Sequence, residues 1–189
     1  MNRLFKKFQQ LIANTSWNRK RNYLIKYGAH IGIGTRINCT VKMFGTEPYL
    51  IKIGEDCLIA DEVHFITHDG GIKVLNTLGY FENERMDNIA PIIIGNNVYI
   101  GTGAYIMPGV SIGNNSIIGA GAIVTHDIED NVVAVGIPAK VIESVEDYYL
   151  HSMRKGRLRP TANMCYEEKM SIYNSIYSNV LHNDSDTMY

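Results

Sequence analysis

The sequence lacks the features that mark secreted, disulfide-linked and membrane-spanning proteins. It has only three cysteines, Cys39, Cys57 and Cys165, and no Cys-x-x-Cys pair, which argues against a disulfide framework and against a zinc site. No apolar run approaches the roughly 18 residues that a membrane span needs. The first residues also lack the apolar segment of a signal peptide. These absences predict reduced thiols and a cytoplasmic location.

Negative charge is missing from the first quarter of the chain. Glu47 is the first acidic residue, and nine basic residues precede it: Arg3, Lys6, Lys7, Arg19, Lys20, Arg21, Lys26, Arg36 and Lys42. The whole chain nevertheless has a net charge of −1, so it has no general attraction for nucleic acid, and we expect no nucleic-acid partner. The N-terminal segment is a local basic region on a nearly neutral protein.

The most informative feature that is present is a repeat of six residues. From Ile94 onwards the chain reads IGNNVY, IGTGAY, IMPGVS, IGNNSI, IGAGAI and VTHDIE. Every first position is a β-branched aliphatic residue, namely Ile94, Ile100, Ile106, Ile112, Ile118 and Val124. Every fifth position is small or apolar, namely Val98, Ala104, Val110, Ser116, Ala122 and Ile128. The same pattern occurs earlier, after Ile31 and after Ile53.

A repeat this short predicts a parallel β-solenoid, an all-β fold in which each hexad forms one short strand and one turn. The first-position residue points into the core, and three hexads close one coil of about 18 residues. A β-sandwich is the alternative, but a sandwich has no physical reason to keep a constant period of six. The period alone does not determine the handedness of the coil.

The repeat and three longer motifs resemble the hexapeptide-repeat acyltransferases. The motifs are "ITHDGG", "IIGAGAIVTHDI" and "VGIPAKVI", and the match runs from Ile31 to Ile142. It is most specific to the sugar O-acetyltransferases, including the maltose and galactoside enzymes and those that modify surface polysaccharides. The resemblance implies a left-handed parallel β-helix and a homotrimer with active sites at its subunit interfaces. It also implies acetyl-CoA as the co-substrate and a sugar or glycan as the acceptor.

The domain organisation follows the limits of the repeat. Residues 29–142 form the predicted β-helix, which a loop insertion interrupts at residues 69–91. An N-terminal helical cap at residues 1–28 precedes it, and a C-terminal helical tail at residues 143–189 follows it.

Both flanking segments have helical patterns. Residues 2–26 place apolar side chains at helical spacing, with basic and amide residues between them. This amphipathic segment either caps the open end of the solenoid or makes a weak contact with an anionic membrane surface. After the repeat we predict helices over Ser144–Met153 and Tyr166–Leu181, and a disordered end, HNDSDTMY.

The repeat stops immediately after a histidine, in the stretch HFITHDGG. Acyl transfer from a thioester to a hydroxyl needs a base, and a histidine side chain, with an ordinary pKa near 6.5, suits that role at neutral pH. We predict that His68 is the general base of a direct transfer in a ternary complex, because it ends a run of hexads and the following Gly70 and Gly71 let the chain turn away. Asp69 either orients the histidine, binds the acceptor or is only a turn residue. His64, at an outward position, is better explained by a structural role.

The resembling enzymes bind the donor along the later coils, where small corner residues allow close approach. The positions that match here are Thr102, Gly103, Ala120, Ala122, Thr125, His126 and Lys140. His126 stands where that family often has a lysine, so the cation offered to a donor phosphate depends on pH. Small corner residues are also what the fold itself requires.

The loop insertion is the predicted acceptor-binding segment, because a loop of this length inside a compact solenoid is usually functional. It contributes Tyr80, Glu82 and Arg85, while Asn38 matches an active-site asparagine of the sugar acetyltransferases. The loop equally suits contact with a neighbouring subunit. A shorter interruption, Met43–Tyr49, is expected on a coil next to it.

The same scaffold also supports other functions. β-Helical carbonic anhydrases need three histidines at a subunit interface. His64 and His68 supply two, but no third histidine stands at a matching position and His126 lies far along the axis, so we expect no metal. N-acetylation of an amino sugar by the same base and a non-catalytic solenoid scaffold both remain open.

Overall fold

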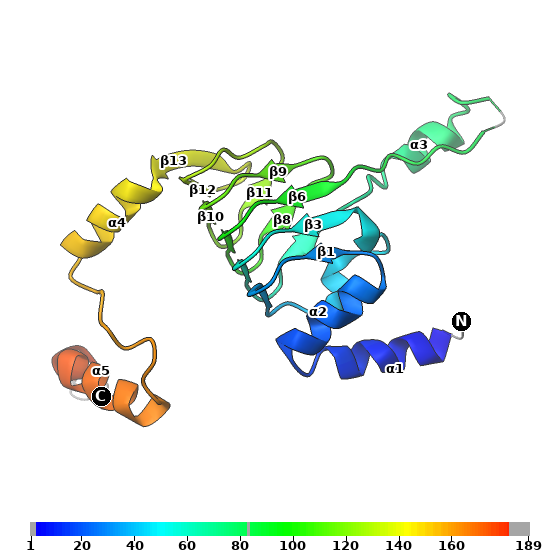
Figure 1. Cartoon of the computed structure of the whole chain (residues 1–189). Coiled ribbons are helices and arrows are strands. Elements are labelled where there is room, and N and C mark those ends of the chain that lie inside the picture. The colour runs from blue at the N-terminus through cyan, green and yellow to red at the C-terminus, as the bar shows by residue number, and fades with distance from the viewer. Residues whose placement is uncertain (1–2, 83, 182–189) are drawn as a thin grey trace, which may run out of the picture. The chain divides into compact units, whose positions relative to one another are not determined.

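The computed structural model describes residues 3–82 and 84–181. Very short strands form three sheets that the chain visits in turn (Figure 1). The first sheet contains β1 (His30–Ile31), β3 (Ile51–Ile53), β6 (Ile92–Ile94) and β9 (Ser111–Ile112). The second contains β2 (Arg36–Ile37), β4 (Leu58–Ile59), β7 (Tyr99–Ile100), β10 (Ile117–Ile118), β12 (Val132–Val135) and β13 (Lys140–Ser144). The third contains β5 (His64–Phe65), β8 (Tyr105–Ile106) and β11 (Ile123–Val124).

Neighbouring strands in the regular part of each sheet are one coil apart and parallel. Ile93 pairs with Ser111, and Tyr105 pairs with Ile123, which is the predicted coil of about 18 residues. The first-position residues of the six hexads are between 0% and 2% exposed, and the fifth-position residues are buried as well. The prediction that these positions form the core is therefore confirmed.

One corner of the coil requires a left-handed backbone conformation. Asp56, Asn97, Asn115 and Asn131 occupy it in successive coils, with φ angles of 54°, 53°, 55° and 61°. Asn and Asp adopt this conformation more readily than most residues. The asparagine side chains also form a ladder, because Asn97 donates to Asn115 and Asn115 donates to Asn131, both at 3.0 Å. The ladder explains why asparagine recurs in the IGNN hexads.

Two insertions interrupt the coils. The first forms the short helices η1 (Val41–Phe44) and η2 (Pro48–Leu50) between β2 and β3. The second, which we call the arm (residues 69–90), contains α3 (Ile72–Thr77) and projects away from the coils (Figure 1). Its two ends meet at its base, where the Ala90 N–H donates to the Thr67 carbonyl at 2.9 Å. The stacking of coils continues past the arm, since β5 pairs directly with β8.

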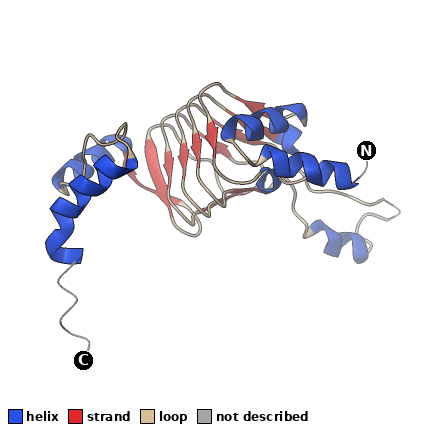
Figure 2. Cartoon of the chain, turned by 90° about the horizontal axis from the view of Figure 1, so that it is seen from below, coloured by secondary structure: helices blue, strands red, loops and turns tan. Residues whose placement is uncertain are grey.

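The N-terminal segment forms two helices rather than the single helix predicted over residues 2–26. The first is α1 (Arg3–Ala13) and the second is α2 (Trp17–Lys26). Ser16 separates them because it takes an extended conformation and caps α2, accepting from the Arg19 N–H at 3.3 Å. Figure 2 shows the pair at one end of the coils.

The parallel coils end where β12 pairs with β13, because this pairing is antiparallel. Two helices then follow, α4 (Val145–Arg154) and α5 (Tyr166–Leu181), and they match the two helices predicted for the tail. Residues from Leu150 onwards form a second compact unit. The segment predicted to be disordered, HNDSDTMY, lies outside the described residues. Among the helices of the described chain, none has the length and apolar character to cross a membrane.

Candidate active site

His68 stands where the chain leaves the coils. Phe65 and Thr67, just before it, are each 1% exposed, so the strand is anchored up to the residue that precedes the histidine. A β-bridge to Ile89 holds the His68 backbone from the returning end of the arm. The His68 side chain itself is 50% exposed. The fold therefore fixes the backbone of this histidine and leaves its ring accessible.

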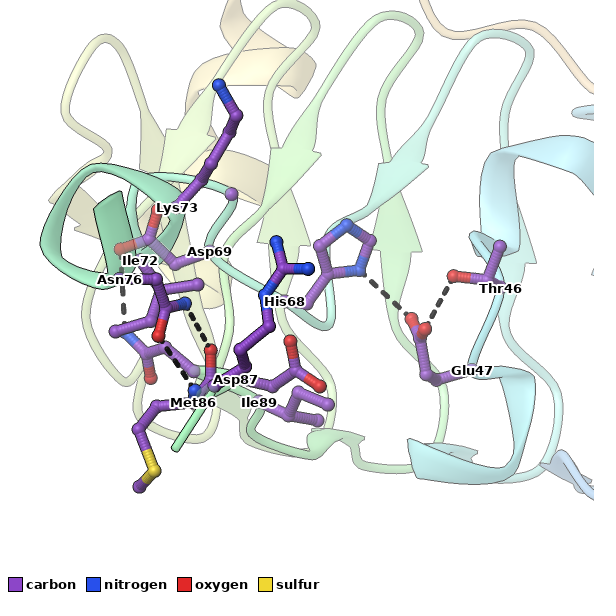
Figure 3. Close-up of a pocket in the computed structure, with 13 residues that line it drawn as sticks. Thr46, Glu47, His68, Asp69, Ile72, Lys73, Asn76, Met86, Asp87 and Ile89 are labelled. Carbon is purple, nitrogen blue, oxygen red and sulfur yellow. Dashed lines mark hydrogen bonds and ion pairs between the residues drawn. The ribbon is translucent and has the colours of Figure 1, made fainter. Parts of the chain in front are cut away.

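The partner of His68 is Glu47, which comes from the first insertion. The Nδ1 atom of His68 lies 3.0 Å from Oε2 of Glu47 (Figure 3). The same oxygen accepts from the Thr67 hydroxyl at 2.8 Å. The Thr46 hydroxyl donates to the other carboxylate oxygen. Since a carboxylate can only accept, this contact assigns the proton of neutral His68 to Nδ1. The Nε2 atom then carries the lone pair that a base needs.

Glu47 is held in its ionised form. Burial raises the pKa of Glu47, but hydrogen bonds from Thr46, Thr67 and His68, together with the positive charge that His68 can acquire, outweigh burial and bring this pKa below its ordinary value of 4.5. A carboxylate in this state stabilises the imidazolium that forms when His68 accepts a proton. The pair is thus arranged for general base chemistry.

A cavity of about 400 Å³ lies between the arm and the coils. Its lining comes from the first insertion, the end of β5 and the arm, and consists of Thr46, Glu47, His68, Asp69, Gly70, Ile72, Lys73, Asn76, Arg85, Met86, Asp87, Asn88 and Ile89. Asn76 of α3 joins this helix to the returning segment of the arm, because its side chain donates to the Met86 carbonyl and accepts from the Met86 N–H, both at 2.8 Å (Figure 3). The His68–Glu47 pair therefore lines a cavity whose walls contain both polar and apolar side chains.

Two of the other predicted site residues, Asp69 and Arg85, line this cavity. One Asp69 oxygen accepts from the Gly71 N–H at 2.8 Å, and the other accepts from the Asn88 side chain at 3.4 Å. Asp69 thus holds the turn at the base of the arm. The carboxylate that contacts His68 is Glu47.

Three predicted acceptor-binding residues lie outside the cavity lining. Tyr80 is 70% exposed on the arm, and Glu82 has a φ of 53° near the tip of the arm. Asn38 follows β2, and its carbonyl accepts from the buried Lys20 ammonium. Within one chain, the structure does not bring these three residues to His68.

Some predicted donor-binding residues occupy the corner that precedes the third sheet. Thr102 and Ala120 belong to successive coils there, since the Gly121 N–H donates to the Thr102 carbonyl at 2.8 Å. Gly103 and Gly121 have φ angles of 72° and 69°, and a side chain at either position would meet no atom within 4 Å. This corner is therefore open to a ligand.

The remaining donor candidates are placed differently. Thr125 and His126, whose hydroxyl and Nδ1 are 2.8 Å apart, lie at the corner that follows the third sheet. Because β5, β8 and β11 pair in register, His126 is two strand spacings, about 10 Å, along the axis from Thr67. Ala122 is fully buried, so its methyl group belongs to the core. Lys140 is exposed at the start of β13.

Sequence reasoning missed Glu47 as a site residue. A signal was present, because Glu47 lies in the interruption Met43–Tyr49 and precedes His68 by 21 residues. That separation is close to one coil, which places the two side chains on neighbouring turns of the chain. The contact could not be predicted because the repeat does not specify the length of the interrupted coil.

No group of three or more His, Cys, Asp or Glu side chains able to hold a metal ion occurs within residues 3–82 and 84–181. His64, the other histidine of the interrupted coil, stacks on Tyr105 with ring centroids 4.5 Å apart and an interplanar angle of 3°.

The coils that follow the arm match the family described as bacterial transferase hexapeptide (six repeats), over residues 91–126. The chain is 46% identical to protein CapG of Staphylococcus aureus, over 69% of this chain and 74% of that protein. It is 38% identical to the galactoside O-acetyltransferase of Escherichia coli strain K12, over 78% of this chain and 70% of that protein. A solved galactoside acetyltransferase in complex with coenzyme A superposes with a TM-score of 0.52 and 30% identity, covering 77% of this chain and 82% of that one. The chain belongs to the hexapeptide-repeat transferase family.

Proposed function

We propose that this protein is an acetyl-CoA-dependent O-acetyltransferase that modifies a hydroxyl group of a sugar or of a surface-polysaccharide precursor. The observation that carries the proposal is the His68–Glu47 pair at the wall of the cavity. The similarity to a galactoside O-acetyltransferase and to an acetyltransferase solved with coenzyme A supports the reaction class and the donor.

His68 acts as the general base. Acetyl-CoA supplies an acetyl group activated as a thioester. Nε2 of His68 takes the proton from the acceptor hydroxyl as the new C–O bond forms, and Glu47 stabilises the resulting imidazolium through Nδ1. When the C–S bond breaks, His68 returns this proton to the leaving sulfur, which restores the neutral base and gives a free thiol.

Transfer is direct, in a ternary complex of enzyme, donor and acceptor. None of the described residues that line the cavity is a serine or a cysteine, and the hydroxyls of Thr46 and Thr67 are both engaged by Glu47. A covalent acyl-enzyme would need a nucleophile within hydrogen-bond reach of its base. The described surroundings of His68 favour the route without one.

The donor lies along the coils that follow the arm. Thr102, Gly103 and Ala120 form an open corner that a side chain-sized group can approach, and the backbone N–H and carbonyl groups of stacked corners suit the amide groups of a pantetheine arm. His126 and Lys140 are the proposed partners for the donor phosphates. Ala122 does not reach this surface, because its side chain is fully buried.

The assembly is proposed to be a homotrimer of left-handed β-helices, working in the cytoplasm with reduced thiols. The cysteines are all free. Ile93, Tyr99 and Tyr105, one on each sheet, are 44%, 38% and 39% exposed, so each face of the coils offers an apolar side chain to a neighbouring subunit. In such a trimer, Tyr80 and Glu82 on the arm are available to a site on the adjacent chain.

A thiol-release assay with acetyl-CoA and a panel of sugars tests the proposal. We expect His68→Ala to lower the rate by 10²- to 10⁴-fold, roughly the contribution of a general base. The matched control is His64→Ala, which removes a nearby histidine whose ring stacks on Tyr105 and should retain activity. A wild-type rate in His68→Ala would rule out the proposed base. Mass spectrometry of the product must show the gain of one acetyl group on oxygen, and acetylation on nitrogen would replace the O-acetyl assignment.

A further inference from the structure

The N-terminal helices carry an apolar surface that the coils do not cover. On α1, Phe8 is 59% exposed, Leu11 is 69% exposed and Ile12 is 44% exposed. Trp17, at the start of α2, is 43% exposed. Phe8, Leu11 and Ile12 lie on one side of α1, and they define what we call the outer face. Large apolar side chains that gather on one side of a surface helix normally face the core, so their position outside calls for a partner.

Among the α1 side chains that the structure describes, residues 7–13, those that pack on the protein are small or polar. Ala13 is 4% exposed. Gln9 accepts from the Tyr27 hydroxyl at 3.2 Å, and Asn14, which follows α1 directly, accepts from the Val41 N–H at 3.0 Å. Polar and small contacts thus attach the described side chains of α1 to the rest of the chain, while Phe8, Leu11 and Ile12 stay exposed.

The end of the solenoid is closed by α2 instead. Leu24 is 1% exposed against the first coil. Arg21 donates to the carbonyls of Ile31 and Gly32, at 2.9 Å and 3.2 Å, and the Lys20 ammonium bonds to a third carbonyl of this coil. The contacts that close this end therefore come from α2, and the exposed residues of the outer face take no part in them.

The charged residues described beside the outer face are all basic. A groove of about 300 Å³ between α1 and α2 is lined by Gln9, Ile12, Ala13, Arg19, Asn22, Tyr23 and Lys26. Lys7, Arg19 and Lys26 are exposed, and no acidic residue occurs among the first 46 residues. An apolar surface bordered by cations is complementary to an anionic membrane surface. Its apolar side chains match the acyl chains, and its cations match the lipid phosphates.

We propose that α1 and α2 dock the protein on an anionic membrane surface. Phe8, Leu11 and Ile12 enter the boundary between headgroups and acyl chains, while Lys7, Arg19 and Lys26 lie near the lipid phosphates. A second copy of the same face is a poorer occupant, because it would bring like charges together. The inference does not depend on the acetyltransferase activity, since docking uses none of the residues around His68.

Vesicle co-sedimentation of the full chain tests this docking. The probes are vesicles of phosphatidylcholine alone and vesicles of equal parts phosphatidylcholine and phosphatidylglycerol, each at low and high ionic strength. We expect binding to the anionic vesicles at low salt, weakened at high salt by screening. Lys7→Gln and Lys26→Gln should each weaken it about fivefold.

Leu11→Glu should weaken vesicle binding at least about tenfold, because it removes an inserted apolar side chain and adds a repelled charge. The matched control is Leu78→Glu on the arm, where the leucine is 65% exposed, close to the 69% of Leu11. Circular dichroism and light scattering of each variant check the fold and the mass.

Equal binding to neutral and anionic vesicles, or unchanged binding by Leu11→Glu, would overturn the proposal. A change in oligomeric mass caused by Leu11→Glu, without any vesicle binding by the wild type, would assign the outer face to a subunit contact instead.

Discussion

The regular coils from β6 to β11 and the two insertions differ in how much of their side-chain surface is buried. In the coils, one aliphatic residue in every six is buried almost completely, and the backbone is held by neighbours above and below. The insertions bury little, as Leu78 and Tyr80 on the arm are 65% and 70% exposed. Yet the chemical groups of the candidate site, Glu47 and His68, stand in one insertion and at the edge of the other.

This difference shows how a repetitive fold acquires a specific site. A coil tolerates an insertion at a corner because the strands on either side still pair, as β5 does with β8 across the arm. The inserted residues are then free of the six-residue pattern and of its demand for aliphatic side chains. Regular coils hold His68, and the insertions supply Glu47 and the walls of the cavity.

The largest difference between the two regions should appear in stability. Ile100→Ala removes a fully buried side chain of a regular coil, and we expect it to cost about 2–5 kcal/mol of unfolding free energy. Leu78→Ala on the arm should cost less than about 0.5 kcal/mol. Urea unfolding of both variants measures the contrast. Equal losses would mean that the arm is as much a part of the core as the coils.

Glu47→Gln tests whether Glu47, in the first insertion, assists His68, at the edge of the second insertion. The amide keeps the shape but removes the charge that favours protonated His68, so we expect kcat to fall roughly tenfold to a thousandfold. The KM for acetyl-CoA should change little. Glu55→Gln, a substitution of the same kind at an exposed position of a neighbouring coil, is the control. An unchanged kcat would reduce the contact between Glu47 and His68 to a structural one.

Asn76→Ala tests the arm as a wall of the site. Losing the two hydrogen bonds to Met86 should loosen the arm and raise the KM for the acceptor by several-fold to about tenfold, since each bond contributes about 1 kcal/mol. The melting temperature should be nearly unchanged, because the coils do not depend on the arm. Thr77→Ala, which removes a hydroxyl that bonds within α3, should leave the KM as it is. A loss of melting temperature without any change in KM would contradict this division of roles.

The smallest expected effect concerns pH and stability. The pKa of Glu47 is lowered in the folded protein, so the native state binds fewer protons than the unfolded state as this group titrates. Its stabilising contribution is present at neutral pH and is lost as pH falls below 4.5 and through the folded-state pKa. Melting curves of the wild type and of Glu47→Gln should therefore converge in acid. A gap that stays constant with pH would show that the charge of Glu47 does not contribute.

Much of the fold is predictable from the repeat, because burial and period are linked. Ile94, Ile106 and Ile118 are in the core for the same reason that they recur every six residues. His68 could be singled out because it ends such a run. The break at Ser16 was missed, although the regular apolar spacing ends at Ile12 and Ser16 is a residue type that often begins a helix.

The sequence by itself determined which residues face the core, where the coils are interrupted and which histidine stands at the interruption, because a six-residue period admits one inward position per strand. Only the tertiary structure decided that Glu47 meets His68, since the contact depends on how two insertions of unrelated length return to the coils. It also decided that the apolar side of α1 faces outward. An amphipathic pattern defines two sides of a helix, and what each side contacts depends on which surfaces the rest of the chain leaves to be covered.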